Sequence, residues 1–216
     1  MLTNRPLRKV FSLSNKPRAI IVPKFPHVRY DGSRFGLLAT NDAIGLAHIL
    51  TVMNKFRIPA EILSSELLSD DIPDDLVCIG GPDGNRVTEL YLRRYCPGFV
   101  LHGNKMDDGG YNFEFSQCGG RTFTDDGEDS WAFIVKLSPA HTGLPGTIML
   151  LWGHEDTGTA AAAFFASQYA SKLSRLNQDA FFVALAASKR LGYRRIQLDP
   201  VNLSVRAFQK SESGNS

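Results

Sequence analysis

Short continuous apolar runs alternate along this chain with segments whose apolar residues recur at helical spacing. The runs at 19–22, 76–79 and 147–152 predict strands of a parallel sheet buried on both faces, and 60–63 predicts a further strand. Apolar residues at i, i+3 and i+4 predict a helix after Thr40 or Asn41 that ends before Pro59, and a longer helix over 159–176. A short helix is expected near Val87–Tyr91.

The middle of the chain has a different pattern. Residues 99–102, 111–115 and 131–137 are strand-like, and the turn signal Asp107–Gly110 separates the first two. This pattern predicts an antiparallel insertion near 99–137, in the form of a flap or a sheet extension. The apolar run 181–187 favours a hairpin with 193–198, and a helix that stops at Leu191-Gly192 is the alternative.

These elements predict an α/β fold with a mainly parallel, three-layer sheet of Rossmann-like or flavodoxin-like type and the antiparallel insertion near 99–137. Residues 18–207 are expected to form a single domain. Residues 1–17 are basic and lack a clear period, so a mobile arm or an edge segment is expected there. Residues 208–216 are expected to be a polar tail.

Composition excludes several classes of protein but identifies no partner. The chain has 216 residues, with 24 Lys and Arg against 22 Asp and Glu, which is typical of a globular domain with a real core. Its apolar runs fall short of the roughly 18 residues that a membrane helix needs, and we expect no signal peptide. The cysteines Cys78, Cys96 and Cys118 form no CxxC motif, so a reducing, cytoplasmic location is expected.

Three of the predicted buried strands end in loops that lead to helices. In open α/β sheets, ligands bind outside the carboxyl ends of the strands, so these loops are expected to share one edge. Glycines permit close backbone approach, and Asn or Thr can cap a helix whose N-terminus suits an anion. Ordinary strand-to-helix turns are the alternative. The predicted ligand-binding residues are Gly80, Gly81, Asp83, Asn85, Gly153, Thr157, Gly158 and Thr159.

The titratable residues His154, Glu155 and Asp156 follow directly after the strand predicted at 147–152. One of them is the candidate general acid or base of an enzyme. Three adjacent residues rarely converge on one ion, and no second pair of ligands is visible, so no metal site is predicted. We name no cofactor.

Two segments carry a resemblance to a known type of domain. Ile79-Gly-Gly-Pro-Asp-Gly-Asn85, followed later by Gly153-His-Glu-Asp-Thr-Gly-Thr-Ala-Ala-Ala162, resembles a poorly characterised bacterial α/β domain with a GGPxxN turn and a late GTxAA helix start. The similarity covers about residues 18–200. It implies a Rossmann-like or flavodoxin-like fold with a ligand edge, and it implies no established activity.

Three functions follow from these observations. The first is a ligand-binding or sensory domain for a nucleotide-like or other small anionic molecule. The second is an enzyme that acts on a nucleotide or related substrate through residues 153–159. The third is a protein-interaction domain without a small ligand, and a partner protein or a homo-oligomer is compatible with each. A membrane is not expected as a partner, and nucleic acid is disfavoured because the basic arm is short.

Overall fold

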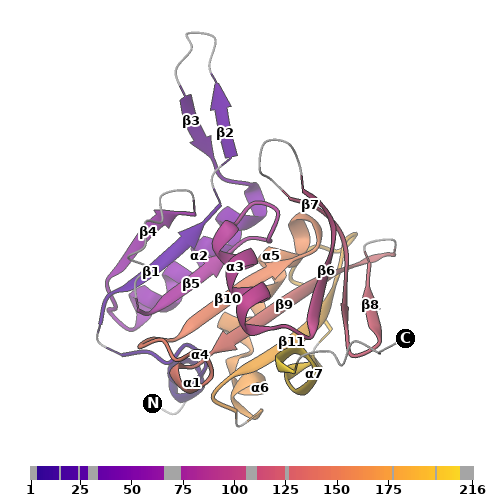
Figure 1. The fold of residues 1–216 in the computed structure, drawn as a ribbon. Coiled ribbons are helices and arrows are strands. Elements are labelled where there is room, and N and C mark those ends of the chain that lie inside the picture. The colour runs from indigo at the N-terminus through magenta and orange to yellow at the C-terminus, as the bar shows by residue number, and fades with distance from the viewer. Residues whose placement is uncertain are drawn as a thin grey trace.

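A mixed seven-stranded sheet forms the centre of the fold (Figure 1). The computed structural model describes residues 4–14, 16–23, 25–28, 34–65, 74–105, 111–124, 127–176, 178–197 and 199–209. Within these residues, the spatial order of the strands in the main sheet is β12 (Val201–Asn202), β11 (Phe181–Ser188), β9 (Asp129–Leu137), β10 (Ile148–Gly153), β5 (Leu76–Ile79), β1 (Arg18–Val22) and β4 (Ala60–Ser64).

Half of this sheet is parallel and half is antiparallel. The strands β4, β1, β5 and β10 pair in parallel, whereas β9 pairs antiparallel with both β10 and β11, and β12 pairs antiparallel with β11. The sheet is therefore mixed, where the sequence predicted a mainly parallel one. The α/β class and the strands expected at 19–22, 60–63, 76–79 and 147–152 are confirmed to within one residue at each end.

The antiparallel insertion near 99–137 exists, but it divides between two sheets. The strands β6 (Phe99–Lys105), β7 (Tyr111–Cys118) and β8 (Arg121–Phe123) form a small antiparallel sheet of their own. The strand β9, by contrast, enters the main sheet between β10 and β11. Its residues 132–137 are buried on both faces, which is the burial of a central strand and not of a surface flap.

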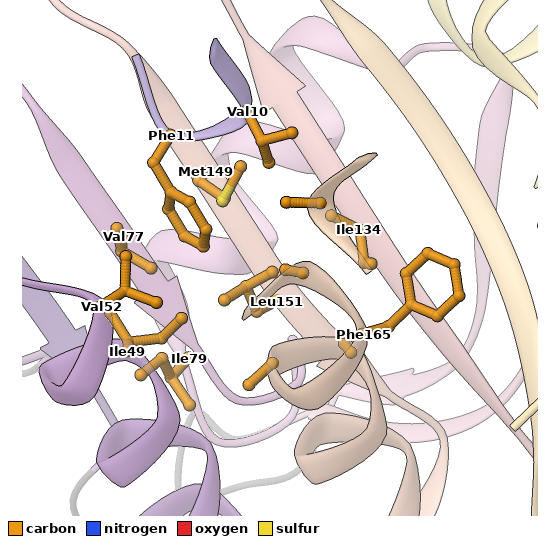
Figure 2. Packing of buried hydrophobic residues seen from close by; sticks show 14 of the residues in the cluster. Val10, Phe11, Ile49, Val52, Val77, Ile79, Ile134, Met149, Leu151 and Phe165 are labelled. Carbon is orange, nitrogen blue, oxygen red and sulfur yellow. The ribbon is translucent and has the colours of Figure 1, made fainter. Parts of the chain in front are cut away.

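Helices cover one face of the main sheet. These are α1 (Arg5–Val10), α2 (Thr40–Lys55), α5 (Glu155–Gln168) and α6 (Ala170–Ser174). Figure 2 shows Val10 and Phe11 beside Met149 and Val52, and Phe165 beside Ile134. We call this apolar cluster the first core.

A second core lies on the opposite face of the sheet. It is covered by α3 (Arg86–Tyr95), by the small sheet and by α7 (Ser204–Phe208), while α4 (Pro139–Thr142) places His141 against Tyr95 and Phe208. Aromatic rings fill much of this core: Phe99 lies 5.7 Å from Trp152 and 4.6 Å from Phe182, measured between ring centroids. Such edge-to-face and tilted contacts add to the area that the rings bury.

The N-terminal segment, expected to be a mobile arm or an edge segment, contains a helix that packs on the first core. Residues 5–10 form α1, and Val10 and Phe11 are 1% and 0% exposed in the first core. Two buried cations bind carbonyls near the end of this helix: Lys136 Nζ donates to Lys9 O at 2.8 Å, and Arg18 Nη2 donates to Ser12 O at 3.3 Å. The last carbonyls of a helix have no partner within the helix, so these side chains satisfy groups that α1 itself leaves open.

The helix predicted at 159–176 is displaced and divided. It begins four residues earlier, at Glu155, and it is interrupted at Tyr169, where α5 ends and α6 follows. The predicted apolar face is nevertheless confirmed, because Ala162, Phe165 and Leu173 all lie in the first core.

Two other segments differ from the prediction in opposite ways. The loop expected at 23–36 includes a hairpin of β2 (Phe25–Val28) and β3 (Arg34–Leu37), which stands at the top of Figure 1. After β11 the chain does turn back, but it pairs through a single bridge, Ala187 with Ile196. The chain therefore turns back antiparallel after β11, as the hairpin interpretation of 181–198 predicted. The second predicted strand, however, is only one bridge. Residues 210–216 of the predicted tail lie outside the described residues.

Candidate functional site

The carboxyl ends of β5 and β10 are neighbours, as the sequence predicted. Gly80 N donates to Leu151 O at 3.1 Å, and a Cβ placed on Gly81 would lie 3.6 Å from Gly153 O. The strand β1 ends next to them, because β1 pairs in parallel with β5. We call this edge of the sheet, formed by the chain directly after β1, β5 and β10, the rim.

Gly80 and Gly81 form the tight strand-to-helix turn that the sequence predicted. Gly80 has φ +103°, and a Cβ there would meet Pro23 Cγ at 2.8 Å, so both the conformation and the space require glycine. The amides of Gly84 and Asn85 donate to Gly81 O at 3.2 and 2.8 Å. These backbone groups are therefore bonded within the turn, while the Gly80 amide is bonded to β10.

Asn85 is a completely buried N-cap of α3. Its Oδ1 accepts from the amides of Val87 and Thr88 at 3.1 and 3.3 Å, and its Nδ2 donates to Ile79 O and Ile21 O at 2.8 and 3.4 Å. A side-chain amide has two acceptor positions and two N–H donors, and all four are used in this cap. Asn85 therefore joins α3 to β5 and β1. All of its hydrogen bonds are used to hold the turn in place.

The start of α5 corrects the predicted anion site. His154 is the N-cap, so Thr157, Gly158 and Thr159 lie inside the first turns of the helix and do not precede it. Glu155 and Asp156 occupy its first two positions; the placement of their side chains lies outside the described residues. Acidic residues at a helix N-terminus complement the helix dipole themselves, so this helix start is electrostatically unfavourable for an anion.

Gly153 and Gly158 serve helix packing. A Cβ on Gly158 would lie 2.5 Å from Trp131 O and 2.7 Å from Gly153 Cα, so the first turn of α5 lies directly against β9 and β10. Thr159 is 3% exposed, and its methyl group faces Gly45 of α2. The close approach that the sequence assigned to a ligand is made by the protein's own backbone.

His154 points into the second core. Its Nε2 lies 3.2 Å from Ser116 Oγ, and its ring centroid lies 5.5 Å from that of Phe133. Burial, with a smaller contribution from the positive charge of Lys189, lowers the pKa of His154 to about 4. The imidazole is therefore neutral near pH 7 and only a weak base. Glu155 and Asp156 stay predictions as the general acid or base.

Two carboxylates of the described residues lie at the rim. Asp83 is exposed in the turn after β5, as the sequence predicted. Asp42, which the sequence reasoning missed, is 8% exposed in the first turn of α2, with Oδ1 3.5 Å from the position of a Cβ on Gly80. A signal was present, because α2 follows β1 and its hairpin, and helices after parallel strands begin at the carboxyl edge.

A basic turn after β11 reaches the same edge of the sheet. Leu185, Ala132 and Gly153 stand in one row across the strands, and β11 runs in the direction of β10. The turn carries Lys189, Arg190, Arg194 and Arg195. Burial, with a smaller contribution from the positive charge of Arg194, lowers the pKa of His48. These cations were not predicted as site residues, because the segment 181–198 was expected to be a hairpin away from the ligand.

Neither a metal ligand set nor a disulfide is present among the described residues. They contain no group of three His, Cys, Asp or Glu side chains placed to hold a metal ion. Cys78, Cys96 and Cys118 are free and buried, and burial raises the pKa of each thiol. Buried neutral thiols are weak nucleophiles, so they contribute packing and not chemistry.

No protein-family model matches this chain, and no curated protein matches it. The described part of the chain holds no helix that is both long enough and apolar enough to cross a membrane.

Proposed function

We propose that this chain is a ligand-binding α/β domain, whose ligand is a nucleotide-like or other small molecule with an anionic group and lies at the rim. The observation that carries the proposal is the convergence of the chain after β1, β5 and β10 at one sheet edge. Ligands of open α/β sheets bind at this edge, at the point where the connections leave toward opposite faces.

The order of the parallel strands supports this location. Numbered in chain order, β1, β4, β5 and β10 stand in the order 2-1-3-4, which is the beginning of the flavodoxin-like order 2-1-3-4-5. The helix α2 packs on the first core and α3 on the second, so the chain leaves β1 and β5 toward opposite faces. We treat a Rossmann-like or flavodoxin-like relation as part of the proposal.

The charges of the rim assign an orientation to the proposed ligand. Asp42 and Asp83 lie beside β1 and β5, where a carboxylate suits hydroxyl groups such as those of a ribose. Lys189 follows β11, which β9 separates from β10, and its amide donates to Glu128 O at 2.9 Å; its positive charge acts on His154, and a cation suits a phosphate or carboxylate. The proposed ligand therefore has its hydroxyl end at β5 and its anionic end toward Lys189.

A thermal-shift screen tests the proposal. The panel contains nucleosides, nucleotides, sugar phosphates and inorganic phosphate, and a nucleotide at 100 times its Kd is expected to raise Tm by about 5–10 °C. Nucleosides are expected to give smaller shifts, because they lack the anionic group.

The variant Gly81→Leu shows whether the shift arises at the rim. Gly81 has no positive φ, and its tightest contact is the flexible end of Asp83, so a side chain fits the fold but fills the rim. Gln168→Leu is the control: it places an apolar leucine at the exposed far end of α5, away from the rim. We expect only Gly81→Leu to lose the shift. Absence of any shift, or an equal shift in both variants, would contradict the proposal.

A further inference from the structure

The edge of the molecule opposite the rim carries a concentration of positive charge. Three segments meet there: residues 4–14 around α1, residues 51–59 at the end of α2, and residues 169–176 around α6. Arg8 lies 5.0 Å over the ring of Phe56, and Lys9 Nζ donates to Ser174 O at 3.1 Å, which ties α1 to both other segments. Figure 1 shows α1 and α6 together at the end away from the β2–β3 hairpin.

These three segments contain seven cations and no Asp or Glu: Arg5, Arg8, Lys9, Lys55, Arg57, Lys172 and Arg175. Six of the seven are exposed, and Lys172 is half-buried and paired with Asp199. We call this surface the basic belt. The whole chain has a net charge of only +2, so the belt is a local excess of positive charge.

One of these cations stands in an unfavourable backbone conformation. Arg57 follows the last turn of α2 with φ +56°, in the left-handed region that glycine or asparagine adopts at least cost. The conformation belongs to the helix end, because the amide of Ile58 donates to Met53 O at 3.0 Å across Arg57, and the arginine adds a cation where glycine would cost least.

We propose that the basic belt binds the phosphate backbone of double-stranded nucleic acid. Lys172 pairs with Asp199 and Lys9 donates to Ser174 O, and the other five cations are spread over all three segments. A polyanion with regularly spaced charges fits this spread, whereas a single small anion does not. The segment at 1–17 alone is too short for such a surface, and the structure adds the cations of α2 and α6.

The surroundings of the belt favour a duplex over two other polyanions. The apolar side chains Leu7, Val10 and Phe11 of its central segment are buried in the first core, so they offer no anchor to a lipid bilayer. Within the three segments, Phe11 is buried, Phe56 lies under Arg8, and Tyr169 stacks on Phe165. Single-stranded nucleic acid is bound through open stacking platforms, and these rings are already occupied.

The test is fluorescence anisotropy with a labelled 30-bp DNA duplex, the matching RNA duplex and one single strand of the same sequence. The belt variant combines Arg5→Gln, Arg8→Gln, Arg57→Gly and Arg175→Gln. The matched control combines Arg93→Gln, Arg94→Gln, Arg121→Gln and Arg206→Gln, which removes the same charge from exposed positions outside both the belt and the rim. We expect the belt variant to lose at least tenfold in duplex affinity at 100 mM salt and the control to lose less than threefold.

The salt dependence of duplex affinity reports how many phosphate contacts the protein makes. Each phosphate contact contributes about 0.9 to the slope of log K against log salt, so the belt variant should lower that slope by about 3 to 4. Arg57→Gly alone should weaken binding while its Tm stays equal or rises, because glycine relieves the left-handed conformation. If the role of Arg57 were purely structural, Arg57→Gly would lower Tm instead.

Three results would overturn the proposal. They are no duplex binding at 50 mM salt, equal loss in the belt and control variants, and binding to phosphatidylserine vesicles in place of the duplex. Each outcome leaves the ligand proposed for the rim unaffected, because that proposal is decided by the effect of Gly81→Leu on the thermal shift and the belt proposal by the belt variant.

Discussion

Replacing Asn85 with alanine tests the most connected hydrogen-bond arrangement of the rim. The substitution removes the acceptor of the Val87 and Thr88 amides and the donor to the carbonyls of Ile79 and Ile21, all within a site that is 0% exposed. Loss of a side-chain N-cap costs about 0.5–2 kcal/mol. Each of the two carbonyl bonds contributes about 0.5–1.5 kcal/mol. Together these values predict a loss of about 3 kcal/mol in the free energy of unfolding.

Urea unfolding followed by circular dichroism measures this loss, as a lower midpoint with an unchanged m value. The control is Asn54→Ala, because Asn54 is exposed on α2 and surface substitutions usually stay within about 0.5 kcal/mol. If Asn85→Ala costs less than 1 kcal/mol, the amide does not hold β1, β5 and α3 together, and the rim is less rigid than its geometry implies.

The variant Asn85→Asp separates the capping bonds from the strand bonds. An aspartate keeps the acceptor for α3 but places a second oxygen against two carbonyls, so burial and repulsion should raise its pKa in the fold. A raised folded pKa stabilises the protonated form, so the variant should be closest to the parent protein below about pH 4 and should lose stability as pH rises. A stability difference that does not depend on pH would contradict this account.

Three further predictions concern the core, the imidazole and the start of α5. Phe165→Ala should cost about 3–5 kcal/mol in urea unfolding, because Phe165 is fully buried in the first core; a loss under 1 kcal/mol would mean that the packing face is wrong. The pKa of His154 is lowered from 6.5 to about 4, so the unfolded chain binds this proton first as pH falls. The free energy of unfolding should therefore fall by about 3 kcal/mol between pH 6.5 and pH 4. In His154→Gln this dependence on pH should be weaker. Gly158→Ala should destabilise by at least about 1–3 kcal/mol, because its Cβ would overlap Trp131 O and Gly153 Cα, and tolerance of this change would refute the close contact.

Most helices and strands were predictable from the sequence. Of the strand order in the main sheet, only the parallel half was predictable. Buried runs such as Leu76–Ile79 specify a strand by themselves, and the parallel order of β1, β5 and β10 then follows from general rules of α/β folds. The position of β9 does not follow. Its sequence fits a flap or a central strand equally well, and only the available neighbours, β10 and β11, decide the outcome.

The site was predictable in its place but not in its chemistry. Asn85 and the glycine pair were correctly assigned to a turn, because cap and turn residues act locally. Gly153 and Gly158 were assigned to a ligand because sequence cannot distinguish a glycine that admits a ligand from one that admits a strand. The burial of His154 depends on Ser116 and Phe133, which come from distant strands and leave no local trace.

The contacts of α1 also have a consequence for protein synthesis. Lys9 bonds to Lys136 and to Ser174, which follow it by 127 and 165 residues. A ribosome that adds about 5–20 residues per second needs about 10–30 s to reach these partners after it has made α1. Until β10 and α6 are made, Val10 and Phe11 lack the part of their covering that comes from Met149 and Leu173. The helix α1 therefore completes its docking late, and its apolar and basic side chains stay unshielded on the nascent chain until β9 and α6 have been made.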